Sequence, residues 1–165
     1  MCFVPYLWGA LPVLRRGPMT IVVRGLPAPQ GSKAFKGMAG GHAILQESSK
    51  KVKPWREAVK AAALDACGID QQSTRAITCI RGPVDVQMIF TMPRPKSAKA
   101  GARPGSRPDL SKLIRSTEDA LTDVGVWEDD SRVVRVVAMK IFAGQHGDSL
   151  PVPGCVIRIE PMGPV

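Results

Sequence analysis

Apolar and polar residues alternate in several parts of the chain, which is the pattern of strands that are covered on one face. The alternation is clearest in 83–92, where Val84, Val86 and Met88 share one face while Asp85 and Gln87 share the other. Further strands are predicted for 20–26, 34–38, 42–46, 132–142 and 155–160. The Val-rich segment 132–142 is expected to be a central strand of the sheet.

A first helix is predicted for 54–67, where Trp55 and Val59 begin a run of apolar residues at three- and four-residue spacing. Pro54 suits the first turn of a helix, and Gly68 is a natural terminator. We expect Arg56 and Lys60 to lie on its solvated side.

A second helix is predicted from about 109 to 122, because its apolar residues fall on one arc at 100° per residue. That arc holds Leu110, Leu113, Ile114, Thr117, Ala120 and Leu121. The polar side divides into two flanks, one with Asp109, Lys112, Ser116 and Asp119 and the other with Ser111, Arg115 and Glu118.

The order of these elements predicts an α+β fold, in which two main helices pack on one face of a mixed sheet. At 165 residues the chain has the size of one domain. Residues 1–18 are apolar but interrupted by Pro5 and Pro12, so we expect a peripheral or disordered extension before a domain at 19–165.

The charge balance favours an anionic partner, since the formal net charge is +9 and the sequence pI about 9.8. No basic amphipathic helix of the kind that binds membrane surfaces is predicted. The segment 93–108 holds basic residues, four prolines and no acid, so it is expected to form an exposed, mobile arm. Contact with a DNA or RNA backbone explains this composition better than a solubilising loop, which normally mixes charge signs. The basic residues are Arg94, Lys96, Lys99, Arg103 and Arg107.

The cysteines and histidines do not predict a soft metal site. Cys2, Cys67, Cys79 and Cys155 are scattered without zinc or redox spacing, and His42 and His146 lie far apart. We therefore expect buried or neutral thiols in a reducing compartment.

Two acidic positions flank the second helix: Asp109 at its head, and 128–130 (Glu-Asp-Asp) just beyond its end. Carboxylates from separate segments can hold Mg²⁺ beside a phosphodiester. Asp109 and Asp130 are expected to converge if the helix and the following strand pack antiparallel. The alternative is that Asp109 only caps the helix and 128–130 form a solvated turn.

Segment 108–134, PDLSKLIRSTEDALTDVGVWEDDSRVV, resembles the signature of the RusA family of Holliday junction resolvases, endonucleases common in phages and prophages. That signature is roughly a (K/R)-x-D-x-D-(N/K)-L stretch, a helix ending in DALT, and a (V/F)-W-x-D-D-(A/S)-x-V segment. LPAPQGSKAF and FTMPRPKS upstream also resemble the family, so the likeness covers nearly all of 20–160.

The resemblance implies a Mg²⁺-dependent homodimer, with Mn²⁺ as a substitute ion, that nicks opposed strands of a four-way DNA junction in the cytoplasm. Asp109 and Asp130 match the family's first and last catalytic aspartates, and Arg115 matches its catalytic basic residue. Metal contacts are implied for Asp109, Asp130, Asp129 and Ser111. DNA contacts are expected for Lys33, Arg94, Lys96, Lys99, Arg103, Arg107 and Lys112.

One position departs from the family pattern, because its middle aspartate is Ser111 here. A hydroxyl is a neutral, weak Mg²⁺ ligand, so the site loses a charge on which cation affinity depends. Asp129 or Asp119 can compensate. The alternative function is a non-catalytic junction-binding protein, and a basic RNA-binding module is less favoured since aromatic residues make up 5% of the chain.

Overall fold

The computed structural model describes residues 17–31, 33–39, 42–47, 50–69, 78–145 and 147–163, with the backbone alone in 33–39 and 42–47. Nearly all of the expected extension 1–18 lies outside these residues. The elements in chain order are β1 (Met19–Arg24), β2 (Lys33–Ala39), β3 (His42–Glu47), α1 (Val52–Cys67), β4 (Val84–Met92), α2 (Leu110–Asp123), the 3₁₀ turn η1 (Asp130–Arg132), β5 (Val133–Phe142) and β6 (Gly154–Pro161).

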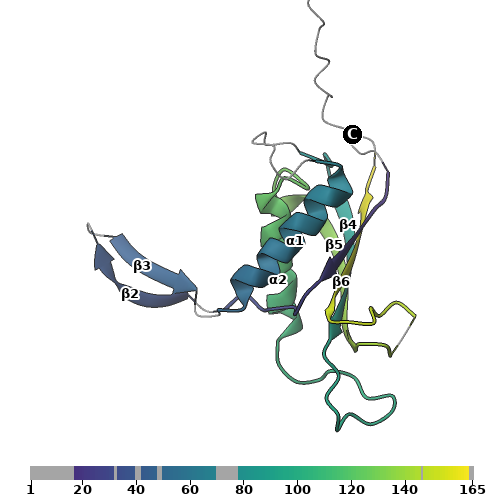
Figure 1. The fold of residues 1–165 in the computed structure, drawn as a ribbon. Helices are drawn as coiled ribbons and strands as arrows, with labels where there is room; N and C mark the ends of the chain where they lie inside the picture. Colours follow the sequence, from purple (N-terminus) through teal and green to yellow (C-terminus); the bar gives the residue numbers. More distant parts are fainter. Residues whose placement is uncertain are drawn as a thin grey trace, which may run out of the picture.

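The main sheet is mixed and has the strand order β1-β6-β4-β5. β6 runs antiparallel to both of its neighbours, whereas β4 and β5 are parallel and are connected through α2. α1 and α2 lie side by side on one face of this sheet, and the β2–β3 hairpin projects away from it (Figure 1). The expected α+β architecture is therefore confirmed, and the alternating burial of Val84–Met88 confirms the pattern read in β4.

The expectation that the Val-rich strand is central was wrong, because β5 forms one edge of the sheet. β6 follows β5 in the chain but is inserted between β1 and β4, which leaves β5 with a single neighbour. Val134 is 59% exposed, and Val137 and Met139 are each 43% exposed. An apolar edge strand is a site at which another chain can pair.

The core lies between the helices and the sheet and is anchored by Trp55 and Trp127, both almost fully buried. The indole Nε1 of Trp55 donates to Thr117 Oγ1 across the two helices at 3.2 Å. Ser116, expected on a polar flank, is instead fully buried, because the loop after β1 covers it and Ala28 O accepts from its hydroxyl at 2.7 Å. No helix in the described part of the chain has the length and apolar character needed to span a bilayer.

Arg56 and Lys60 were expected to face solvent, but both point from α1 toward α2. They lie 2.8 Å and 3.0 Å from the carboxylate of Asp123, and Arg56 also lies 3.5 Å from Asp119. Burial tends to raise the pKa of Asp123, but the hydrogen bonds from Lys60 and Arg56 outweigh it and lower the pKa overall. One polar flank of α2 is thereby turned toward α1.

The expectation of free thiols was wrong for Cys67 and Cys79, which form a disulfide. The chain around Cys79 hydrogen-bonds to the turn that follows α2, which places Cys79 beside the last residue of α1. Cys155 is free and buried, and its burial raises the pKa of the thiol, so it stays neutral as expected.

Candidate active site

A groove of about 800 Å³ opens where the C-terminal ends of β4 and β5 meet the N-terminus of α2. Prolines from two loops, the one after β1 and the one between β4 and α2, form much of its wall, and five ionisable side chains line it. These are Lys51, Arg107, Asp109, Lys112 and Lys140. A groove with four cations and one carboxylate suits a polyanion held next to an acidic group.

Asp109 occupies the N-cap position of α2, but its side chain makes no capping hydrogen bond. The carboxylate is about half exposed and lies 3.3 Å from Lys112 Nζ. The simple alternative of a helix cap is therefore not realised in this structure. The oxygens of Asp109 remain accessible from the groove.

Lys140 was not identified from the sequence, because it stands in a strand whose alternation suggested only sheet packing. Its ammonium donates to the carbonyl oxygens of Ser106 and Pro108, each at 2.8 Å. The sequence holds one signal that could have identified it, a single lysine in the Val-rich segment that forms β5. In the structure this lysine is in register with the core residue Phe90.

The acidic segment after α2 combines local hydrogen bonds with the exposed side chain of Asp130. Asp129 Oδ1 accepts from Ser131 N at 2.9 Å, and these hydrogen bonds with Ser131 lower the pKa of Asp129. Glu128 pairs with Arg132 at 2.7 Å. Asp130 is exposed and forms no ion pair with any described basic side chain. The turn alternative therefore holds for Glu128 and Asp129, and the exposed side chain of Asp130 hydrogen-bonds to that of Asp129.

Glu118 lies beside Asp130 and was also missed as a candidate. Burial, and then the neighbouring charges of Asp130 and Asp119, raise the pKa of Glu118 above its usual range. Glu118 shares a flank of α2 with Ser111 and with Arg115, which is exposed and has no ion pair in the described part of the chain. The other polar flank of α2 pairs with α1 through Asp119 and Asp123, whereas Glu118 lies near Asp130 at the start of β5.

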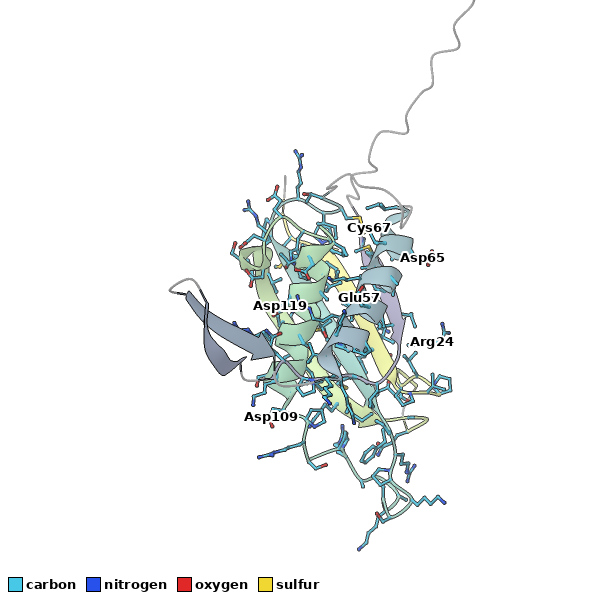
Figure 2. The ribbon with its side chains drawn as sticks, turned by 60° about the vertical axis from the view of Figure 1, so that its left-hand side comes forward. Arg24, Glu57, Asp65, Cys67, Asp109 and Asp119 are labelled. Carbon is cyan, nitrogen blue, oxygen red and sulfur yellow. A yellow bond between two sulfur atoms is a disulfide. The ribbon has the colours of Figure 1, made fainter. Side chains whose placement is uncertain are left out.

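Asp109 and Asp130 do not converge within one chain. Asp109 precedes α2, and Asp130 lies near Glu118, which is nine residues further along the helix, or about 14 Å at 1.5 Å per residue. An antiparallel helix and strand join the end of the helix, not its beginning, to the start of the strand. Figure 2 shows Asp109 at one end of α2 and Asp119 well along it. The described residues contain no group of three or more metal-ligating side chains.

The basic arm is exposed, as expected, and it is tethered at several points. The guanidinium of Arg94 donates to the carbonyls of Ala98 and Lys99, and Gln145 Nε2 donates to Ala102 O. The predicted contact residues Lys96, Lys99, Arg103 and Arg107 all have exposed side chains. The side chain of Lys33 lies outside the described residues.

Comparisons with known proteins give one family. The profile described as Endodeoxyribonuclease RusA matches residues 25–150, which include the groove, α2 and both acidic positions. A search among curated proteins gave no match.

Proposed function

Because the chain belongs to the RusA family of endodeoxyribonucleases, we propose that it is a Mg²⁺-dependent nuclease that resolves four-way DNA junctions by paired nicks. We propose that it does so in the cytoplasm of a bacterial host cell. The observation that carries the proposal is the basic groove with the uncapped carboxylate of Asp109 in its wall. A phosphate backbone would be attracted to the groove and held against a potential metal ligand.

The donor chemistry of the acidic positions fits Mg²⁺, which prefers carboxylate oxygens and water. Asp109 and Asp130 would supply charged ligands, and Asp129 and Ser111 stand next to them along the chain. A bound Mg²⁺ would neutralise phosphate charge and lower the pKa of a coordinated water. Within one subunit, however, Asp109 and Asp130 are too far apart to share an ion.

A homodimer resolves this separation, and the apolar edge of the sheet supports it. Val134, Val137 and Met139 are exposed on β5, whose outer side has no strand partner in the subunit. We propose that β5 pairs antiparallel with the same strand of a second copy, which removes both edges and joins the sheets.

Antiparallel pairing would also place the two acidic positions together. The N-terminus of α2 lies at the C-terminal end of β5, where Lys140 bonds the carbonyl of Pro108. Asp130 lies at the N-terminal end of β5. A twofold axis through the middle of the strand would therefore bring Asp109 toward the partner subunit's Asp130, twice in each dimer.

The remaining side chains have roles that follow from their charge. Arg115 is exposed on the flank of α2 that also carries Glu118, the neighbour of Asp130, and there its guanidinium would stabilise negative charge on the scissile phosphate. It stays protonated at neutral pH and cannot serve as a proton donor. The arm and Lys112 would hold the flanking backbone, through Arg94, Lys96, Lys99, Arg103 and Arg107, with Lys33 on the hairpin as a further contact.

The test is cleavage of an end-labelled four-way junction in Mg²⁺, in Mn²⁺ and in EDTA. Wild-type protein should make paired, metal-dependent nicks, and Asp130→Asn should lose them. Asp65→Asn is the matched control, because Asp65 is an exposed aspartate on α1 that belongs to neither acidic position. Tight junction binding without nicks in either metal would instead favour the junction-binding protein that Ser111 suggests.

A further inference from the structure

Lys140 is a charged residue on a face of the sheet that is otherwise apolar. It is in register with Phe90 of β4, which is fully buried against the helices. Residues paired across adjacent strands project from the same face, so Lys140 also projects toward the helix side. A lysine in this position is costly unless its ammonium is hydrogen-bonded.

The ammonium of Lys140 donates its hydrogen bonds to backbone carbonyl oxygens and not to an acidic side chain. Ser106 O and Pro108 O each lie 2.8 Å from Nζ, and no described carboxylate forms an ion pair with it. Two carbonyl dipoles solvate an ammonium without cancelling its unit charge. The wall of the groove therefore retains a positive charge at Lys140.

Both carbonyls belong to the segment that leads directly into Asp109. Pro108 precedes Asp109, and the extended backbone of Asp109 then begins α2. Lys140 thus ties the last residues of the basic arm to the end of β5, while Lys112 holds the carboxylate itself from the helix at 3.3 Å. The direction in which the Asp109 carboxylate projects depends on this tie.

We propose that Lys140 is the positioning residue of the Asp109 half of the active site. It fixes the backbone from which the carboxylate projects, and its uncompensated charge contacts a DNA phosphate in the groove. This inference rests on the proposed nuclease function and assigns a role within it to a strand residue outside the recognised acidic motif.

The test compares Lys140→Met and Lys140→Arg with Lys60→Met. Methionine keeps the apolar stem of lysine and removes the ammonium. Lys60 is a fitting control because it is also a half-buried, paired lysine, but it lies at the opposite end of α2. Each methionine variant loses one positive charge, and thermal unfolding verifies that each is folded.

Four measurements are expected to change in Lys140→Met and not in Lys60→Met. The cleavage rate at fixed Mg²⁺ should fall about 10- to 100-fold, and the Mg²⁺ concentration for half-maximal rate should rise about tenfold. The slope of log K against log salt for junction binding in EDTA should become shallower by about one. Hydrogen exchange of the 105–112 amides should be faster without metal or DNA. Lys140→Arg should restore the salt slope and part of the rate.

A folded Lys140→Met with the wild-type rate, Mg²⁺ dependence and salt slope would overturn the inference. Faster exchange in 105–112 with no change in the other readouts would also overturn it, since Lys140 would then only stabilise the loop. Wild-type protein that binds junctions but never cuts them would refute the proposed function itself. If Lys140→Met does not fold, the same readouts on Lys140→Arg and Lys140→Gln decide the matter.

Discussion

Mixing two inactive variants should restore cleavage if the active site is shared between subunits. Asp109→Asn and Asp130→Asn each remove one proposed ligand from both sites of a homodimer, so each variant alone should be inactive. In a mixed dimer, one site combines both asparagines, and the other combines the intact Asp109 of one subunit with the partner subunit's Asp130. Cleavage should therefore reappear only after subunits exchange.

The expected magnitude follows from the geometry of α2. Two carboxylates on one Mg²⁺ must lie within about 5 Å of each other, given bonds of about 2.1 Å. Asp109 is separated by about 14 Å along the helix from Glu118, the neighbour of Asp130, so one subunit cannot supply both ligands. Random exchange makes about half of the dimers mixed, and each has one intact site, which leaves about a quarter of the wild-type sites.

The products should also differ from those of the wild type. A supercoiled plasmid with a cruciform reports this directly, because paired nicks linearise it and a single nick relaxes it. The mixture should yield mainly nicked circles, whereas wild-type protein should yield linear DNA. Native mass spectrometry of differently tagged variants verifies the exchange. A mixture of verified mixed dimers that is as inactive as its parents would refute the shared site, and a monomer at working concentration would refute the dimer.

Four further outcomes follow from individual side chains. Ser111→Asp should lower the Mg²⁺ concentration for half-maximal cleavage about tenfold if position 111 faces the ion; an unchanged metal titration would place it outside the site. Asp123→Asn should cost about 1 kcal/mol of unfolding free energy at pH 7 in urea titrations. Because the pKa of Asp123 is lowered by folding, this difference should be present above pH 4 and vanish as the pH falls through the folded pKa; a constant difference would contradict the ion pairs. Glu118→Gln should raise the melting temperature by about 1–2 °C at pH 7 without metal, because folding raises the pKa of Glu118 and so disfavours its ionised form. This gain in melting temperature should disappear below pH 4, where Glu118 is protonated in the folded and the unfolded state. An equal gain at both pH values would argue against this cause. Replacing Lys96 and Lys99 with glutamine should make the salt slope of junction binding shallower by about two, and an unchanged slope would remove the arm from the interface.

Local patterns in the sequence predicted most elements, because helix and strand periodicity depends on neighbours in the chain. β4 and α2 were identified in this way, and their ends were nearly right. The position of β5 was not predictable, since strand order depends on the distant pairing of β6 with β1 and β4. The Cys67–Cys79 disulfide was missed for the same reason, because it depends on how the turn after α2 docks.

The sequence named candidate ligands for the site, which remain a prediction, but it did not give their arrangement in space. Asp109 and Asp130 flank a helix that the sequence predicts, but the expectation that they converge was wrong, because the strand after the helix begins at the end of the helix that is remote from Asp109. Lys140 and Glu118 were not predicted as site residues, because the role of each depends on a neighbour from another segment. Lys140 donates to the carbonyl oxygens of Ser106 and Pro108, and Glu118 lies near Asp130. Alternation in a strand and amphipathicity in a helix do not report such contacts.

The length of α2 has a consequence for the spacing of the two cuts. In the proposed dimer the two catalytic centres would be as far apart as Asp109 and Asp130 of one subunit, so the part of α2 from Asp109 to Glu118 would act as a ruler of about 14 Å between them. That span equals the rise of about four base pairs. Adding one helical turn to α2 would lengthen the ruler by about 5 Å and displace both cuts together, so the symmetry of the products would survive while their positions moved.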